Sequence, residues 1–381
     1  MARRPARELL CHAVLPPMTV CMACLLVGAT CHSVDDPDAS FGLLGLQGLA
    51  VQTEQEPNDD FGIAQPVAAP FDTIVEISGT IATVDDIDVY DLGPADPGEN
   101  WEIDVACRDG LDAVAALFDE NHDVLIINDD RNWAAGIIDP LIRMDMRHST
   151  SRLYLAIAAS STGPGAGSYT LTIERVAAEA PGYRPQQVLL DFDGAAHAGV
   201  GGRTYTDVPA FDAADISDEF AGQTELLKDL IEQFILADYA GYNVDFYRSD
   251  RGEAPDGPYT TLVFGEDDPA YLGLADYVDH YNDNPTQTAF IYTDAFDLFM
   301  PLRPNLDEMA AVIGNVAAHE FGHLLGLSHS VEALDLMDIS SSAQEMLQDR
   351  GHGRTPLDET VFPLGWQNSP RLLLETLGPR P

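Results

Sequence analysis

Short runs of alternating apolar and polar residues follow one another between about residues 52 and 176. Alternation with a period of two is typical of a strand that buries one face, and clusters of Gly, Pro, Asn or Asp separate the runs. Many short strands at regular spacing predict an antiparallel β-sandwich over residues 52–177. The seven predicted strands are 73–77, 86–92, 101–107, 113–118, 124–127, 151–158 and 168–174.

The pattern changes after residues 177–184, which contain one proline and one glycine, are followed by Pro185 and form a predicted linker. Residues 223–237 place leucine, isoleucine and phenylalanine on one stripe with helical spacing. Strands and helices that alternate predict an α/β (α+β) domain over residues 183–381. Its predicted strands are 188–193, 242–247, 260–264 and 289–293.

A second predicted helix carries the strongest chemical pattern in the chain. Asn305 is a good N-cap, and Glu308 is placed to complete a capping box. His319 and His323 are four residues apart, so both imidazoles project from one face of this helix.

The chain reverses after this helix. Gly326 is predicted to end the helix, because glycine accepts the left-handed conformation that a reversal requires. His329 follows three residues later. The sequence therefore predicts that a third imidazole returns to the metal ion that the first two hold.

The expected chemistry is that of a catalytic zinc site. Three neutral imidazoles, from His319, His323 and His329, leave one position of a tetrahedral zinc open for water. Glu320 is placed to act as the general base and then as the acid. A bare His-Glu-x-x-His arises by chance in roughly one such chain in seventy, and the full pattern in about three in a hundred thousand.

The long pattern HExxHxxGxxH resembles the signature of the metzincin zinc endopeptidases. Within that clan the chain looks most like the matrixins, because Ser330 follows the third histidine and Met337 stands eight residues after His329. The resemblance implies that Met337 is the Met-turn residue below the metal. It departs at residues 338–340, where the usual aromatic residue and proline are absent, and no cysteine switch is visible because Cys107 lies in a predicted strand.

Five fragments of the N-terminal segment carry a second resemblance, namely 56–60, 86–90, 111–119, 128–130 and 167–172. In this order they resemble the bacterial pre-peptidase C-terminal (PPC) domain. That resemblance implies a non-catalytic, jelly-roll-like sandwich of the kind found beside secreted peptidases. Its Asn-Asp-Asp turns are candidates for Ca²⁺ binding or for ordinary Asx turns.

The first 31 residues have the layout of an export signal. Basic residues at positions 3, 4 and 7 precede an apolar run at 20–29. We therefore expect a signal peptide or lipoprotein signal over residues 1–31, a tether over 32–51, and an extracellular, periplasmic or cell-surface protein. Cys31 is a candidate lipid anchor, with plain signal cleavage after Ala29 or Thr30 as the alternative.

Acidic residues dominate the charge. The chain has 63 Asp and Glu against 19 Lys and Arg, a net charge of −44, and this balance disfavours a nucleic-acid partner. The acidity fits a solubilising surface, calcium sites or a basic partner. Asp267, Asp268 and residues 276–283 are the candidate calcium ligands, with ordinary solvated loops as the alternative. The remaining candidate histidines, at positions 197, 280 and 352, lack ligand spacing and are expected in solvated loops.

These patterns predict a secreted zinc endopeptidase that acts on proteins or peptides. One alternative is a surface-binding or adhesion protein whose zinc domain is inactive. The intact Glu320 argues against that alternative. Another is hydrolysis of a non-protein amide by the same metal site.

Overall fold

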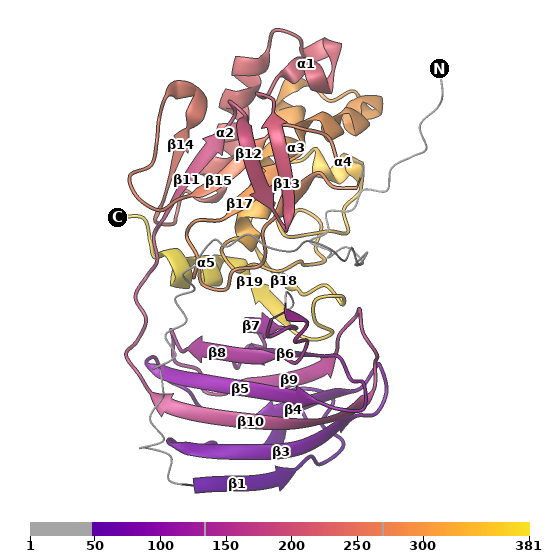
Figure 1. Cartoon of the computed structure of the whole chain (residues 1–381), viewed down its shortest axis with the longest axis vertical. Helices are drawn as coiled ribbons and strands as arrows, with labels where there is room; N and C mark the ends of the chain where they lie inside the picture. The colour runs from indigo at the N-terminus through magenta and orange to yellow at the C-terminus, as the bar shows by residue number, and fades with distance from the viewer. Residues whose placement is uncertain (1–47, 133–134, 269) are drawn as a thin grey trace, which may run out of the picture.

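The structure is a computed structural model that describes residues 48–381 except 133, 134 and 269. A β-sandwich and an α/β domain are stacked, and α5 (Ser369–Leu377), β18 (Arg354–Pro356) and β19 (Trp366–Asn368) lie between them (Figure 1). The predicted signal, most of the predicted tether and Cys31 lie outside the described residues.

The N-terminal domain is the predicted sandwich, with two five-stranded sheets. All seven predicted strands are present. Three others, β1, β2 and β8, were not predicted, and β1 begins inside the predicted tether. The first sheet has the order β1 (Gly48–Thr53), β3 (Thr73–Ile81), β10 (Gly167–Ala177), β5 (Glu99–Cys107), β8 (Leu141–Asp145). The second has the order β2 (Gln65–Pro66), β4 (Ile87–Asp91), β9 (Tyr154–Ala159), β6 (Ala113–Phe118), β7 (Val124–Asn128).

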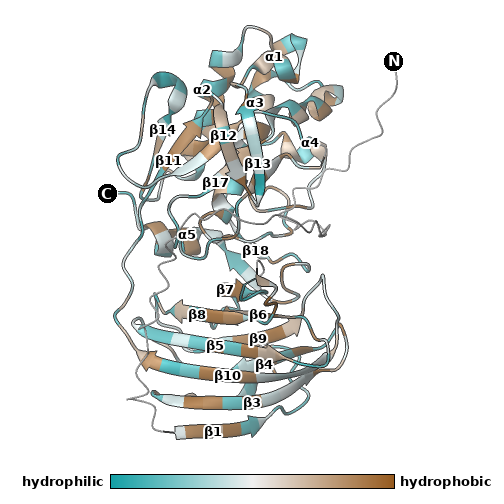
Figure 2. Cartoon of the chain, viewed as in Figure 1, coloured by the Kyte–Doolittle hydropathy of each residue, from teal (hydrophilic) through white to brown (hydrophobic). Residues whose placement is uncertain are grey.

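The two sheets differ in how they are buried. In the first sheet, buried residues alternate with more exposed ones along β5 and β10, so one face packs on the core and the other meets solvent. Every residue of β6 is buried, because the outer face of the second sheet is also covered. Leu357 and Phe362 from the C-terminal part of the chain pack in the cluster that covers this face. In Figure 2, brown segments mark hydrophobic residues in the strands of both domains.

The C-terminal domain is built on a five-stranded sheet. Four of its strands are parallel, and the edge strand β16 is antiparallel to its neighbour β17. The order is β14 (Val244–Arg248), β11 (Gln186–Asp191), β15 (Thr260–Phe264), β17 (Thr288–Ile291), β16 (Gly273–Ala275).

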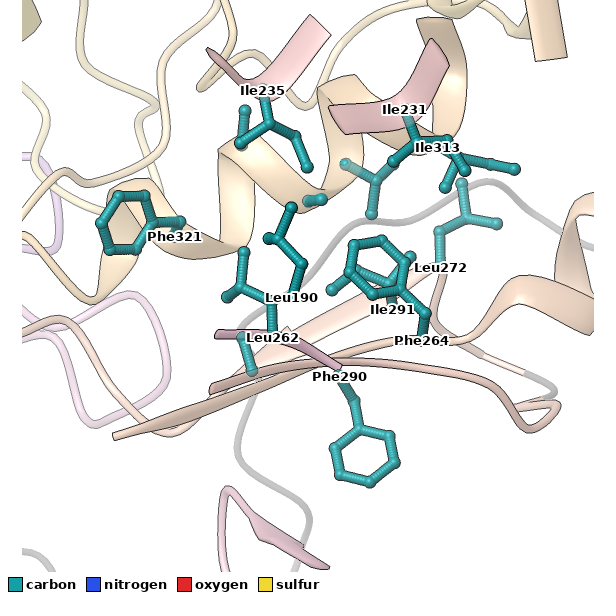
Figure 3. Packing of buried hydrophobic residues seen from close by; sticks show 14 of the residues in the cluster. Leu190, Ile231, Ile235, Leu262, Phe264, Leu272, Phe290, Ile291, Ile313 and Phe321 are labelled. Carbon is teal, nitrogen blue, oxygen red and sulfur yellow. The ribbon is translucent and has the colours of Figure 1, made fainter. Parts of the chain in front are cut away.

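Two long helices, α2 (Thr224–Asp238) and α3 (Leu306–His323), pack on one face of this sheet. Ile231 and Ile313 from the helices meet Leu190 from the sheet in the core of the domain (Figure 3). Phe290 points to the opposite face, where its ring stacks on Tyr205 of the hairpin formed by β12 (Ala195–Val200) and β13 (Arg203–Val208).

Short elements connect these parts of the C-terminal domain. The four-residue helices are α1 (Ala213–Ile216) and α4 (Ala343–Met346), and the 3₁₀ segments are η2 (Asp218–Phe220), η3 (Ser249–Arg251) and η4 (Thr293–Leu302). Within the described residues, none of the helices combines the length and the apolar character needed to cross a membrane.

Buried ion pairs join the two domains. Asp119 and Asp123, beside the turn between β6 and β7, are 0% and 1% exposed. Arg354 Nε donates to Asp123 Oδ1 at 2.6 Å, and Arg371 pairs with Asp119. Burial alone would raise the pKa of Asp119, but the hydrogen bond from Arg371 holds that pKa below its usual value. A buried carboxylate requires such a partner, so these pairs hold the sandwich against the C-terminal segment.

Candidate metal centre and active site

Helix α3 carries the metal-site motif into the core. Asn305 caps the helix as predicted, and its side chain forms the capping box with Glu308. The residues from Met309 to His323 are buried, so the motif is fixed by packing on all sides. Gly326 then has a φ of +94°, and a Cβ there would lie 2.8 Å from the Cα of His280. Glycine is required at this position both for the backbone angle and for the close approach of the 276–283 loop.

The three predicted ligands converge. The Nε2 atoms of His323 and His319 are 3.1 Å apart, and those of His323 and His329 are also 3.1 Å apart. One ligand nitrogen from each ring lies within 4.8 Å of the others. Ligands at tetrahedral positions about 2.0–2.1 Å from zinc lie roughly 3.3 Å from one another, so this spacing suits a zinc ion.

The opposite ring nitrogens are held by the backbone. Nδ1 of His319 lies 2.7 Å from the Leu336 carbonyl, and Nδ1 of His323 lies 2.8 Å from the Leu327 carbonyl. An Nδ1–H that donates to a carbonyl leaves Nε2 with its lone pair free for a metal. Burial lowers the pKa of His319 to about 3 and that of His323 to about 4, which keeps both rings neutral. The donor set therefore fits zinc.

Glu320 lies between the helix and the sheet edge. It is 3% exposed, and burial raises the pKa of its carboxyl to about 8 despite a hydrogen bond from the backbone of Ala275. A Cβ on Gly273 would lie 2.5 Å from Glu320 Oε1, so the backbone of β16 passes directly beside the carboxylate. The predicted base thus sits next to β16, the edge strand of the sheet.

The turn after His329 places Met337 below the helix. Met337 is fully buried, and a Cβ on Gly322 would lie 2.7 Å from its sulfur. Asp335 organises this turn, because its carboxylate accepts hydrogen bonds from Ser330 Oγ at 3.0 Å, Met337 N at 2.9 Å and Gly353 N at 2.8 Å. The sequence pattern pointed to Met337 but gave no sign of the role of Asp335.

A buried glutamine fixes the segment that carries the third imidazole. Gln367 in β19 is 1% exposed, and its Oε1 accepts from Ser328 N at 2.7 Å while its Nε2 donates to Ser328 O at 2.8 Å. Ser328 immediately precedes His329, so β19 positions that ligand. Nothing in the sequence separates Gln367 from other glutamines, because the contact spans 39 residues.

The other candidate histidines are not all solvated loop residues. His197 is exposed, in strand β12. His280 is half-buried, and its Nε2 lies 2.8 Å from the Ile127 carbonyl of the sandwich. His352 is half-buried too, with its ring edge-on to Tyr239, and burial lowers its pKa to about 3. The expectation of solvated loops was therefore wrong for the last two, because tertiary packing covers both rings.

Cys107 and the acidic candidates have partners in the protein. Cys107 lies at the end of β5, and burial, with nearby Asp139, raises the pKa of its thiol to about 12. Asp268 pairs with Arg203 at 2.8 Å, and Asp279 accepts hydrogen bonds from the backbone of its own loop. The carboxylates that do group within 4.8 Å of one another, among the described residues, are Glu54, Glu56 and Asp88, and Glu56, Asp59 and Asp86.

Comparisons with known proteins agree with the sequence analysis for the C-terminal domain. Residues 210–349 match the model of the matrixin family, as predicted. This match and the converging imidazoles support a zinc metallopeptidase. No curated protein matches the chain.

Solved structures resemble each domain separately. The pre-peptidase C-terminal domain of a Bacillus anthracis collagenase is 17% identical, covers 29% of this chain and 94% of its own, and has a TM-score of 0.23. The periplasmic g-type lysozyme inhibitor PliG of Aeromonas hydrophila is 14% identical, with coverages of 33% and 98% and a TM-score of 0.22. Archaemetzincin from Methanopyrus kandleri is 14% identical, with coverages of 44% and 87% and a TM-score of 0.26.

Proposed function

We propose that this protein is a secreted zinc-dependent endopeptidase that hydrolyses internal peptide bonds of proteins or peptides. The observation that carries the proposal is the convergence of three imidazole Nε2 atoms beside a buried glutamate. His319, His323 and His329 would hold the ion. This donor set leaves a coordination position free for water or substrate, which is the arrangement of a catalytic rather than a structural zinc site.

When bound, zinc supplies Lewis-acid chemistry that acidifies water and polarises a carbonyl group. The protein supplies the proton transfer. Glu320 takes a proton from the attacking water and delivers it to the amine that leaves. Because burial raises the pKa of its carboxyl to about 8, Glu320 has a greater affinity for that proton than an exposed glutamate. Met337 forms an apolar floor below the imidazoles, with its sulfur against Gly322.

The edge strand β16 is the natural place for the substrate backbone. β16 ends the sheet next to Glu320, and an extended peptide forms main-chain hydrogen bonds along such an edge. Binding through the backbone suits an enzyme that acts on internal bonds. A small non-protein amide lacks such a backbone and would lose these hydrogen bonds.

The test is cleavage of an unfolded protein by the purified chain, before and after a zinc chelator and after zinc is returned. We expect cleavage that the chelator abolishes and zinc restores. Turnover of small amides without protein cleavage would support the amidase alternative. Tight zinc binding with no cleavage of either substrate would refute the proposal and favour a surface-binding protein.

Export and calcium belong to the proposal as secondary elements. The basic and apolar layout of residues 1–31 supports export, with Cys31 as the candidate anchor. The carboxylates of Glu54, Glu56 and Asp88 support a calcium site in the sandwich. Asn58, which lies in the same segment, is fully buried, and its side-chain Oδ1 and Nδ2 have no partner among the described residues.

A further inference from the structure

A cavity between the two domains contains part of the metal centre. Its volume is about 290 Å³, and His323 and His329 line it together with Ser328. The opposite wall comes from the sandwich, including Asp129 and Ser160. Ligand cavities begin at roughly 300 Å³, so this space suits one large side chain beside the metal rather than a whole small-molecule ligand.

The walls of this cavity are held together by contacts across the domain interface. His280 Nε2 lies 2.8 Å from the Ile127 carbonyl, and Ser161 Oγ donates to the Thr360 carbonyl at 2.9 Å. All four of these residues belong to segments that line the cavity. The sandwich wall is therefore fixed relative to the zinc ligands before any substrate binds.

The sandwich wall presents a carboxylate with an unmet bonding capacity. Asp129 Oδ1 is buried without a hydrogen-bond partner among the described residues, and Oδ2 accepts only a long bond of 3.4 Å from Ser160 Oγ. Burial, together with Asp130 and Asp112, raises the pKa of Asp129 to about 7. The described residues that line the cavity include Glu359 but no lysine or arginine. A carboxylate that lacks a cationic partner in the cavity wall would be stabilised by a cationic group that enters the cavity and forms a charge-assisted hydrogen bond with it.

We propose that the sandwich domain supplies a subsite of the active site, in which Asp129, assisted by Ser160, binds the cationic side chain of an arginine or lysine of the substrate. This inference rests on the proposed peptidase function and specifies its substrate class. The sandwich then acts as one wall of the active site and not only as a separate accessory domain. Asp129 is a specificity-determining residue, and it takes no part in the bond cleavage.

The experiment uses pairs of peptides that differ only in charge. A single arginine is placed at each position in turn around the cleaved bond, and each peptide has a partner in which citrulline, a neutral isostere, replaces it. For the purified chain we expect kcat/KM to be about tenfold higher for arginine than for citrulline at one position, since one charge-assisted contact is worth about 1.4 kcal/mol or more. Asp129→Asn should reduce this ratio to about one, because the carboxylate that distinguishes the charged from the neutral side chain is then absent.

Asp130→Asn is the matched control. It removes the same charge one residue further along, and Asp130 does not line the cavity. Because Asp130 contributes to the raised pKa of Asp129, its removal favours the ionised carboxylate, so we expect the arginine to citrulline ratio to stay the same or to rise in this variant. An unchanged ratio in Asp129→Asn, an equal loss in both variants, or an equal loss for both peptides would overturn the proposal.

A binding measurement separates this inference from the proposed function. In Glu320→Ala the predicted base is missing, so fluorescence anisotropy reports peptide affinity without turnover. Tighter binding of the arginine peptide that is lost in Glu320→Ala/Asp129→Asn supports the subsite even if the chain cleaves nothing. Equal affinities for arginine and citrulline peptides in Glu320→Ala refute the subsite even if the chain is an active peptidase.

Discussion

Gln367 gives a sharp test of how the fold positions the metal centre. Its amide pairs with both backbone groups of Ser328, the residue before the predicted ligand His329. Gln367→Met keeps a side chain of similar length and removes both hydrogen bonds. The variant therefore leaves the core volume almost unchanged and releases the segment that carries the third imidazole. It also removes the hydrogen bond that Gln367 Nε2 donates to Ser369 Oγ at 3.2 Å.

The size of the effect follows from burial. Each buried backbone group of Ser328 that loses its partner costs about 1–3 kcal/mol, so the two together cost about 2–6 kcal/mol of unfolding free energy. Residues that orient a metal ligand typically account for about 10–100-fold in metal affinity. We therefore expect zinc affinity in Gln367→Met to fall by about that factor.

The assay is competition with a chromophoric zinc chelator on the folded protein, followed by urea unfolding with and without zinc. Gln187→Met is the matched control, because Gln187 also pairs with both backbone groups of one residue, Asp256, at 2.9 Å each. That pair is exposed to solvent, so we expect Gln187→Met to lower the unfolding free energy by less than about 0.5 kcal/mol and to leave the zinc affinity unchanged. Unchanged zinc affinity in Gln367→Met would refute the positioning argument, whatever happens to stability.

Three further predictions address the helix end, a buried acid and the carboxylate cluster. Gly326→Ala should lower the unfolding free energy, measured in urea, by about 1–3 kcal/mol, since the added Cβ would be strained by the φ of +94° and would meet His280. Gly241→Ala, where no atom lies within 4 Å of the added Cβ, should lower it by less. Equal losses in the two variants would contradict this explanation. Burial, with Asp349 nearby, raises the pKa of Asp238 from 3.8 to about 8, so the folded state favours the protonated carboxyl. The stability that this carboxyl contributes is fully present below about pH 4 and is lost as the pH rises towards 8. The melting temperature of Asp238→Asn should therefore exceed that of the wild type increasingly between pH 4 and 8.5, and a difference that does not depend on pH would disprove the assignment. Ca²⁺ should raise the melting temperature of the wild type but not of Glu56→Gln, which belongs to both carboxylate groups, and an equal response of the two proteins would exclude this site.

Local patterns predicted the helix that carries the metal site almost completely. The Asn305 cap, the four-residue histidine spacing and the turn at Gly326 depend on interactions within a few residues, so the sequence contains them. Seven sandwich strands were predicted for the same reason, because period-two alternation is a local signal. The short strand β2 and the strands β1 and β8 were missed, since their weak apolar patterns are completed by partners far along the chain.

Contacts between distant segments could not be predicted. The fully apolar strand β6 is buried on both faces because Leu357 and Phe362, more than 200 residues later, cover it. Gln367 acts through hydrogen bonds to a residue 39 positions away, and Asp335 acts through hydrogen bonds that organise one turn. Neither kind of contact produces a periodic pattern in the sequence. The presence of Asp129 in the same cavity as His329 depends on how the two domains pack, and that packing relies on side-chain pairs such as Asp123 with Arg354.

The proposed function requires Glu320 to perform proton transfer at a zinc site formed by three histidines. Its most direct test is kcat/KM for an unfolded protein substrate, measured for the wild type and for Glu320→Ala at equal zinc content, with zinc quantified in each preparation. General acid and base catalysis contributes about 10²–10⁴-fold, so the account predicts a loss of at least about a hundredfold with zinc still bound. Activity in Glu320→Ala within a few fold of the wild type at equal zinc content would contradict the account.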